Sequence, residues 1–413
     1  MNHLPTEILL FIGEYTVKHS HWRERCRTLH ALVLCCQRFY NIFQSLLYHY
    51  LILGEFLTKE VRLVMHLWKH PELASQARKL KLCWPSDDDQ CLRLGDYKDD
   101  EQSRVEFIDQ ALQEIFTSEE KETESKWREW LHNFREEAWV GVLLVRLAHL
   151  ESIEFGHERS ELITPPFPFM QEVHAHCVVH YSAIDQKIIT PFFYFPNVRS
   201  ITGSDIWATA EGEHVLDPCD IIQPSYSVRK ITVYGIYHCH GMLDWLAVCR
   251  ELEHLYIQAA SHPDDEEILY PFDAMVFYQA LLPFRQTLRT LDVTYNPLYN
   301  DRLIDNNGWN LEKDNIPFQS LREFSVLQDL IIRHAHLMLI SCSSSRTLRL
   351  SLRKLSIRDI VEDFSIDLVS ELQSLVTNRD ALPHLVTLEL GEKGIRDENA
   401  ISKKSRYSLE FGT

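Results

Sequence analysis

Two histidine-rich stretches hold the residues of this sequence whose types and spacing could bind a metal ion. HAHCVVH contains His174, His176, Cys177 and His180, and YHCHG contains His238, Cys239 and His240. Alternate residues of a β-strand share a face, so either stretch could aim two imidazoles at one ion. Neither has a second Cys/His pair at zinc-finger spacing, and a chain with 21 histidines produces such runs by chance. We therefore expect no metal and no other cofactor, and a metal-dependent hydrolase is the least favoured interpretation.

The sequence lacks the other common catalytic signatures. No glycine-rich phosphate-binding loop occurs, and 13 glycines among 413 residues leave little material for one. No H-E-x-x-H, G-x-S-x-G or C-x-x-C motif is present. We therefore expect a protein that is not itself an enzyme.

Composition and charge narrow the function classes further. A chain of 413 residues with 45% hydrophobic residues can bury large cores, and its length predicts several modules or a repeat array. The formal net charge of −18 argues against a nucleic-acid partner, which requires clustered Lys and Arg. No apolar run approaches the roughly 18 residues of a membrane span, and the first residues lack the pattern of a secretory signal. With ten scattered cysteines, these features predict a cytoplasmic or nuclear location, or both, and no membrane partner.

A phrase with apolar residues at offsets 0, 3 and 5 recurs along the chain. Its nine copies begin at Ala77, Leu150, Val198, Val228, Leu252, Leu288, Leu321, Leu352 and Leu385. Six of the nine carry Arg in the second slot, and helical stretches such as DAMVFYQALLPF lie between several copies. A short strand plus a helix at a near-regular spacing predicts a repeat solenoid with one parallel sheet. Offsets 0, 3 and 5 should point into the core, and offsets 2, 4 and 6 outward.

The first fifty residues contain two apolar stretches, LPTEILLFIGEY and LHALVLCCQRFYNIFQSLLYHYL. Pro5 suits the first turn of a helix, and Leu29 to Leu51 carry apolar residues at helical spacing. Ser45 could cap a third short helix that begins at Leu46. Three short helices bury too little surface to be stable alone, so we expect them to need the rest of the chain, a partner, or both.

Residues 86–125 are strongly acidic. Within this segment, VEFIDQALQEIF has helical periodicity, with Val105, Ile108, Leu112, Ile115 and Phe116 on one side. We expect its flanks to be solvated loops, and the segment to be either a linker or a docking site for a basic partner.

The N-terminal stretches resemble the F-box motif, particularly its fungal form, and the nine phrases resemble the irregular leucine-rich repeats that follow an F-box. The resemblance implies an α/β protein with an N-terminal three-helix F-box, followed by a curved leucine-rich-repeat solenoid with one parallel sheet. The expected domains are an F-box at 1–52, a linking helix and first repeat strand at 53–85, an acidic insertion at 86–125, the leucine-rich-repeat solenoid at 126–391, and a polar C-terminal tail at 392–413.

The resemblance also implies a function, the substrate-recognition subunit of an SCF-type cullin-RING ubiquitin ligase. The F-box would dock on a SKP-type adaptor and thereby join the cullin, and the repeats would hold an unidentified target protein. Residues that match the family's adaptor contacts are Leu4, Pro5, Ile8, Leu9, Ile12, Leu32, Val33, Arg38, Phe39, Leu46 and Leu47.

The outward offsets of the three central phrases give a candidate substrate-binding patch. Its members are Lys230, Thr232, Tyr234, His254, Tyr256, Gln258, Thr290, Asp292 and Thr294. Aromatic residues supply most binding hot spots, whereas charged neighbours set specificity. The alternatives are that these residues merely solvate the sheet, that the helical hairpin only caps the solenoid, and that the protein is a leucine-rich-repeat scaffold unrelated to ubiquitin.

Overall fold

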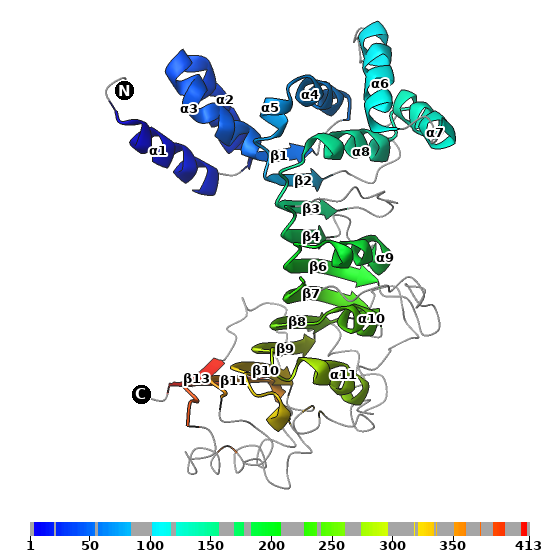
Figure 1. Ribbon diagram of the computed structural model, residues 1–413. Helices are drawn as coiled ribbons and strands as arrows, with labels where there is room; N and C mark the ends of the chain where they lie inside the picture. Colours follow the sequence, from blue (N-terminus) through cyan, green and yellow to red (C-terminus); the bar gives the residue numbers. More distant parts are fainter. Residues whose placement is uncertain are drawn as a thin grey trace, which may run out of the picture. The chain divides into compact units, whose positions relative to one another are not determined.

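The protein is a mixed α/β molecule, seen in a computed structural model (Figure 1). The structure describes residues 4–19, 22–53, 57–83, 101–116, 121–156, 169–176, 183–207, 227–237, 241–260, 274–295, 321–333, 351–360, 383–392 and 406–410, together with Phe318, His336 and Leu372. The chain forms two compact units, Met1–His174 and Ala175–Thr413.

The first unit begins with three helices that lead into a sheet. These helices are α1 (Thr6–His19), α2 (Trp22–Cys35) and α3 (Gln37–His49). They are followed by β1 (Tyr50–Leu53), α4 (Leu57–Lys69), α5 (Pro71–Ala74), β2 (Lys79–Cys83), α6 (Glu101–Ile115), α7 (Lys121–His132), α8 (Glu136–Arg146) and β3 (Ser152–Gly156). The next strand, β4 (Glu172–His176), includes the boundary between the two units. Strands β2 and β3 are neighbours in the sheet, but in the sequence the three helices α6, α7 and α8 come between them.

The division between α2 and α3 differs from the expectation. The structure breaks the helix at Cys36, whose extended backbone (φ −165°, ψ 163°) starts α3. Ser45 caps nothing, because α3 runs through it without interruption to His49. Ile42 and Phe43 are buried before Ser45, and Leu46 packs on the same core after it, so tertiary packing overrides the capping preference of serine.

Helix α6 confirms the helical periodicity within the acidic segment. Four of its residues are buried: Phe107, Ile108, Ala111 and Leu112. The Phe107 ring stacks on Trp139 of α8 with centroids 5.7 Å apart and meets Trp68 of α4 edge-on at 6.0 Å. Helix α7 begins at Lys121, so it crosses the expected boundary at residue 125. Residues 86–100, where a solvated loop was expected, lie outside the described part of the chain.

The second unit consists mainly of strands with short helices between them. Its elements are β5 (Ile184–Asp185), α9 (Gln186–Ile189), η2 (Thr190–Tyr194), β6 (Ser200–Trp207), β7 (Lys230–Tyr237), α10 (Gly241–Val248), β8 (His254–Ala259), α11 (Ala274–Leu281), η3 (Leu282–Phe284), β9 (Thr290–Tyr295), η5 (Leu321–Glu323), β10 (Asp329–Arg333), β11 (Lys354–Ile360), β12 (Thr387–Glu392) and β13 (Arg406–Glu410). The helices α9, α10 and α11 lie along one side of the strands of this unit (Figure 1).

The described strands belong to one sheet in the order β1-β2-β3-β4-β6-β7-β8-β9-β10-β11-β12-β13, and β5 pairs with β6 beside this path. Among the strand pairs whose register is described, only β12 and β13 are antiparallel, and the others are parallel. The expected α/β class and single parallel sheet are therefore confirmed. The segment expected to be a polar C-terminal tail contains β13.

The recurring phrase marks the strands closely. In eight of the nine copies a strand begins two residues after the phrase does, as β7 (from Lys230) follows Val228. The strand predicted from the copy at Leu321 is wrong, because this segment begins with the 3-10 helix η5. Strand β10 instead begins two residues after Leu327, which starts the phrase LQDLII. Both segments have apolar residues at offsets 0, 3 and 5, so the pattern alone cannot separate them. Strand β4 was missed, although Met170 starts the same pattern with Val173 and Ala175.

The second slot of the phrase, where Arg is frequent, has two structural uses. Its backbone carbonyl accepts two amides from the next strand: the amides of Glu253 and His254 both donate to Arg229. Its side chain reaches the same slot of the neighbouring phrase, because Arg229 and Arg289 both form ion pairs with Glu253. In the first unit Arg78 pairs with Glu151 in the same way. These pairs are partly exposed and add little stability, but they favour the observed register.

Strands β6 and β7 share a kink that depends on one glycine. Gly235 has a φ of +72°, and Asp205 on the adjacent strand has a φ of +54°. The pairing of β7 with β8 shifts register between Tyr234 and Ile236, on either side of this glycine. Side chains other than glycine are strained at such φ values, so Gly235 makes the kink possible.

Replacing Gly235 with Ala should lower the free energy of unfolding by about 1–3 kcal/mol, because alanine is strained at positive φ. Its Cβ would also lie 2.9 Å from Oδ1 of Asp205. Urea denaturation of the full chain measures the change. Ser204→Ala on β6 is the control and should change stability by less than about 0.5 kcal/mol. A Gly235→Ala loss no larger than that of the control would contradict this account.

Candidate protein-interaction surfaces

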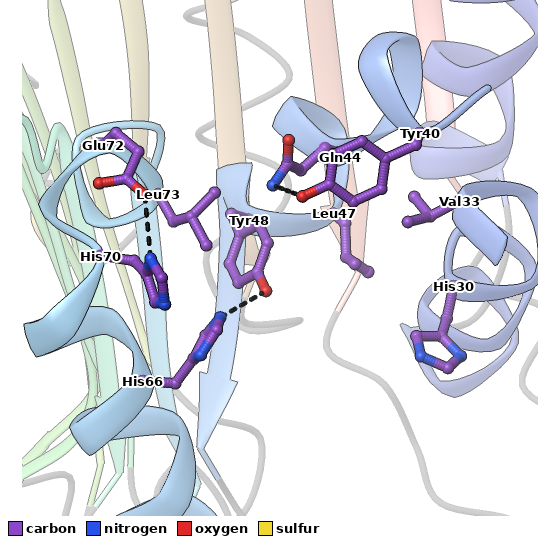
Figure 2. A pocket seen from close by; sticks show the side chains of 10 residues that line it. All are labelled: His30, Val33, Tyr40, Gln44, Leu47, Tyr48, His66, His70, Glu72 and Leu73. Carbon is purple, nitrogen blue, oxygen red and sulfur yellow. Dashed lines mark hydrogen bonds and ion pairs between the residues drawn. The ribbon is translucent and has the colours of Figure 1, made fainter. Parts of the chain in front are cut away.

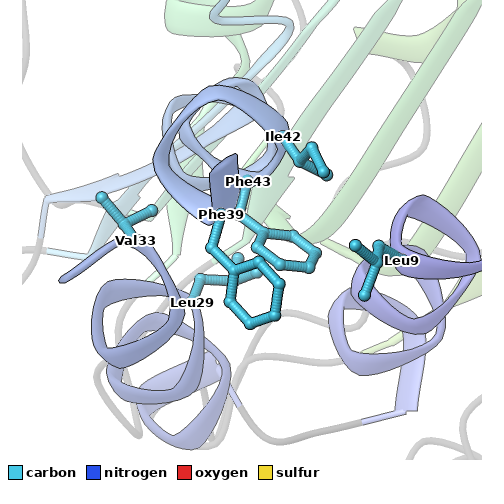
Figure 3. Packing of buried hydrophobic residues seen from close by; sticks show 6 residues of the cluster. All are labelled: Leu9, Leu29, Val33, Phe39, Ile42 and Phe43. Atoms are coloured by element: carbon cyan, nitrogen blue, oxygen red, sulfur yellow. The ribbon is translucent and has the colours of Figure 1, made fainter. Parts of the chain in front are cut away.

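The helices α1, α2 and α3 enclose a small apolar core (Figure 3). Its buried members are Leu9, Leu29, Val33, Phe39, Ile42 and Phe43. The rings of Phe39 and Phe43 meet edge-on with centroids 5.4 Å apart. Gly13 lets α1 approach α3 closely, since a Cβ there would lie 2.6 Å from Cδ1 of Leu46. One face of α1 therefore packs against α3 in this core.

The other face of α1 is apolar and exposed. Ile8, Phe11, Ile12 and Tyr15 keep 47%, 65%, 44% and 59% of their surface accessible. Their spacing of three, four and seven residues places them along one side of the helix, and we call them the α1 stripe. Leu34 and Tyr40, on α2 and α3, are exposed as well. Isolated exposed apolar residues are common, whereas a continuous stripe of large ones marks an interaction surface.

The eleven residues expected to contact an adaptor divide into three groups. Pro5, Ile8 and Ile12 are exposed; Leu4, Leu32, Arg38, Leu46 and Leu47 are half-buried; and Leu9, Val33 and Phe39 are buried. The half-buried leucines pack against the helical core. Arg38 donates a hydrogen bond to the carbonyl of Leu4, which holds the start of the chain against α3. Sequence reasoning omitted Phe11 and Tyr15 as contacts, although α1 has apolar residues on both of its faces.

The register of β7, β8 and β9 brings the nine expected substrate-binding residues into three rows. The rows are Lys230, His254 and Thr290; Thr232, Tyr256 and Asp292; and Tyr234, Gln258 and Thr294. We call this array the sheet patch. Adjacent strands lie about 4.8 Å apart, so the three residues of each row are neighbours. The register therefore places these residues side by side on neighbouring strands, as the offsets predicted.

Exposure within the sheet patch is uneven. Tyr234 is 54% exposed, whereas Thr232 and Thr290 are each only 4% exposed, contrary to the expectation that all nine face solvent. Thr290 Oγ1 lies 3.0 Å from Nδ1 of His254 and donates to Asp329 at 3.4 Å. Burial chiefly lowers the pKa of His254, which favours a neutral imidazole. A threonine side chain is short, so longer side chains around it on the same face of the sheet can cover it. This accounts for the burial of Thr232 and Thr290.

Asp292 occupies the centre of the last strand of the sheet patch in an unfavourable setting for a carboxylate. Burial raises its pKa to about 6, although Arg358 and Lys354 act in the opposite direction. These two cations form ion pairs with Glu389 instead, at 3.3 and 2.9 Å. Within the described residues, Oδ1 of Asp292 is buried without a hydrogen-bond partner. Such a group destabilises the folded state unless a ligand or water reaches it.

Two of the candidate metal-binding histidines lie on a described strand. His174 and His176 lie on β4, and Nε2 of His174 is 3.5 Å from the carboxylate of Glu172. Cys177, His180, His238, Cys239 and His240 lie outside the described residues. Within the part of the chain that is described, no three His, Cys, Asp or Glu residues are grouped as metal ligands would be. None of the described helices is both long and apolar enough to span a bilayer.

Replacing Asp292 with Asn should stabilise the protein at pH 7.5 by roughly 1–3 kcal/mol, since about two pKa units separate the folded and unfolded carboxyl. The raised pKa means that the folded state disfavours the ionised form. The free-energy cost of burying the ionised carboxylate is fully present above pH 6. It disappears below pH 3.8, the pKa of the carboxyl in the unfolded chain. Urea denaturation at pH 7.5 and pH 4 should therefore show a stability gain that shrinks on acidification. A gain that is equal at both values would contradict the burial of an ionised carboxylate.

No protein-family model matches this chain, and no curated protein is significantly similar to it. The function must therefore be argued from the α1 stripe, the sheet patch and the residues that form them.

Proposed function

We propose that this protein is the substrate-recognition subunit of an SCF-type cullin-RING ubiquitin ligase. In this proposal α1, α2 and α3 form an F-box that docks on a SKP-type adaptor, and the adaptor joins them to the cullin. The parallel sheet with its helices is a curved leucine-rich-repeat solenoid that binds the target protein. The chain needs no catalytic residues, because its role is to hold a target lysine near a ubiquitin carrier. Its place of action would be the cytoplasm, the nucleus or both.

The α1 stripe is the observation that carries the proposal. Burying an Ile or Phe side chain fully contributes about 1.5–3 kcal/mol, so covering four half-exposed ones contributes on the order of 3–6 kcal/mol. The helical core is packed by the opposite face of α1, and the four side chains of the α1 stripe remain about half exposed. An apolar patch with aromatic members is typical of the centre of a stable protein interface.

The expected adaptor contacts take different roles in this proposal. Ile8 and Ile12, together with Phe11 and Tyr15, would touch the adaptor directly. Buried residues such as Leu9 and Phe39 would act indirectly, because they fix the orientation of α1 on α3. Arg38 would position the start of the chain through its bond to Leu4.

The sheet patch supports the second half of the proposal. Tyr234 on β7 is 54% exposed, and Nζ of Lys230 lies over the Tyr256 ring, 5.6 Å from its centroid. Tyrosines beside charged and hydrogen-bonding groups provide both contact area and selectivity. We therefore place target recognition on β7, β8 and β9.

The double substitution Ile8→Asp with Ile12→Asp should reduce binding of a SKP-type adaptor at least 100-fold, because it would bury two unpaired carboxylates in an apolar interface. Co-purification and calorimetry with the recombinant adaptor measure the loss. The thermal midpoint should change little, since both side chains are about half exposed.

Thr6→Asp is the matched control, because it adds a carboxylate to the exposed first turn of α1, outside the stripe. This variant should bind the adaptor as the native chain does. Full adaptor binding by the double variant would overturn the F-box assignment. Failure of the native chain to bind adaptor would favour a repeat scaffold unrelated to ubiquitin.

Replacing Tyr234 and Tyr256 together with Ala should weaken target capture at least tenfold, since aromatic anchors dominate protein interfaces. Quantitative mass spectrometry of proteins purified with each variant measures the effect, and the adaptor serves as the internal reference. Ser200→Ala on β6, outside the sheet patch, is the control. If the double variant retains the same proteins at the same ratio to adaptor, target binding must lie elsewhere on the molecule.

A further inference from the structure

A hollow of about 490 Å³ lies within the first unit, between the pair α2–α3 and the pair α4–α5 (Figure 2). Leu47 and Leu73 provide apolar surface between its two walls, and Val33 lies beside His30 on the α2 side. Its size falls within the range of ligand-binding sites. The hollow is distinct from the α1 stripe, as none of its lining residues belongs to α1.

Three aromatic rings, contributed by both sides of the hollow, lie close together in its lining. His66 on α4 and His70, which precedes α5, have ring centroids 4.6 Å apart. Tyr48 on α3 lies roughly parallel to His66 with centroids 6.4 Å apart, and its hydroxyl is 3.5 Å from Nε2 of His66. These three rings offer flat faces and ring edges to whatever enters.

Among the described residues that line the hollow, Glu72 is a carboxylate and none is Lys or Arg. Hydrogen bonding to its own backbone, with a contribution from His70, lowers the pKa of Glu72, so this carboxylate is ionised. Burial, followed by repulsion from His70, lowers the pKa of His66 and keeps its imidazole neutral. No Lys or Arg belongs to the lining, whereas Glu72 Oε1 lies 3.1 Å from Nδ1 of His70 at the rim.

We propose that this hollow binds the guanidinium group of an arginine side chain presented by a partner protein. The group would stack on the faces of Tyr48, His66 and His70 and pair with the carboxylate of Glu72. Its aliphatic stem would lie over Leu47 and Leu73. A planar guanidinium uses ring faces and carboxylates together, which a compact, strongly hydrated ammonium does less well. This proposal does not depend on the ubiquitin-ligase function.

Competing occupants fit the hollow less well. An anion would meet Glu72 and find no cation among the lining residues. A metal ion would find the His66–His70 pair but no third ligand grouped with it within the described residues. The formal net charge of −18 also concentrates cationic partners near the protein.

The proposal predicts a particular dependence on pH. Three histidines face the hollow, His30 from α2, His66 from α4 and His70 from the start of α5, and Glu72 is the one carboxylate in the lining. Protonation of His66 on acidification would place a cation in the hollow that repels a guanidinium. Because the lowered pKa of His66 keeps it neutral near pH 7.5, binding should be strongest there and should fall toward pH 5.5.

The test uses the full chain with ¹⁵N-labelled histidine rings and N-acetyl-L-arginine amide as the probe. NMR titration at pH 7.5 should show saturable shifts of a small set of histidine resonances, which His66→Gln and His70→Gln assign. N-acetyl-L-citrulline amide has nearly the same shape but no charge, and it should bind at least fivefold more weakly. Equal binding of the two probes, or no shift of the His66 and His70 resonances at 50 mM arginine amide, would overturn the proposal.

A substitution at the rim tests the carboxylate directly. Glu72→Gln should weaken arginine amide at least fivefold and leave the thermal midpoint unchanged, because Glu72 is exposed. Glu24→Gln removes an equally exposed carboxylate from α2 outside the hollow, and it should bind the probe as the native chain does. Equal affinity for both variants, or binding that does not weaken at pH 5.5, would contradict the assigned role of Glu72 and the histidines.

Discussion

In-register pairing of parallel strands is the constraint on which the rest of this structure depends. Strand β7 buries the residues at offsets 3 and 5 of its phrase, Ile231 and Val233, and Val228, two positions before the strand, is buried as well. The other strands that follow a phrase repeat this pattern except β12, where Leu388 is buried but Leu385 and Leu390 are half-buried. A shift of one residue would turn this apolar set outward and bury the polar set. The backbone carbonyl of the second slot also helps to fix the register, because it accepts hydrogen bonds from two amides at the start of the next phrase. The same register that closes the core therefore also arranges the sheet patch into rows.

The helical surfaces of the first unit follow from how α3 joins the sheet. Helix α3 ends at His49, β1 begins at the next residue, and the His49 carbonyl accepts the amide of Arg78 just before β2. This bond holds the end of α3 beside the sheet, and Gly13 then brings α1 against α3. The α1 stripe and the hollow beside α3 are thus positioned by the same helix. Each uses surface that the helical core leaves uncovered.

Sequence reasoning predicted the repeated elements well and the irregular ones poorly. The offsets placed eight strands and the nine residues of the sheet patch, because period-two burial is a local property of each phrase. They failed at Leu321, where two consecutive matches compete, and at Met170, where Ala175 is a weak apolar signal. The burial of Thr232 and the unpaired oxygen of Asp292 depend on neighbouring strands, which no single phrase contains. The hollow was missed for the same reason, as residues from four helices form it.

The insertion of α6, α7 and α8 between adjacent strands has a consequence for how the protein is made. Strand β2 ends at Cys83, and its partner β3 begins at Ser152. A ribosome adds about 5–20 residues per second, so the intervening stretch of about seventy residues takes roughly 4 to 14 seconds to synthesise. Throughout that interval the edge of β2 that pairs with β3 has no partner strand in the nascent chain. The aromatic core of α6 and α8 closes on Trp68, which emerges before β2, so these helices can dock while the ribosome is still extending the chain toward β3.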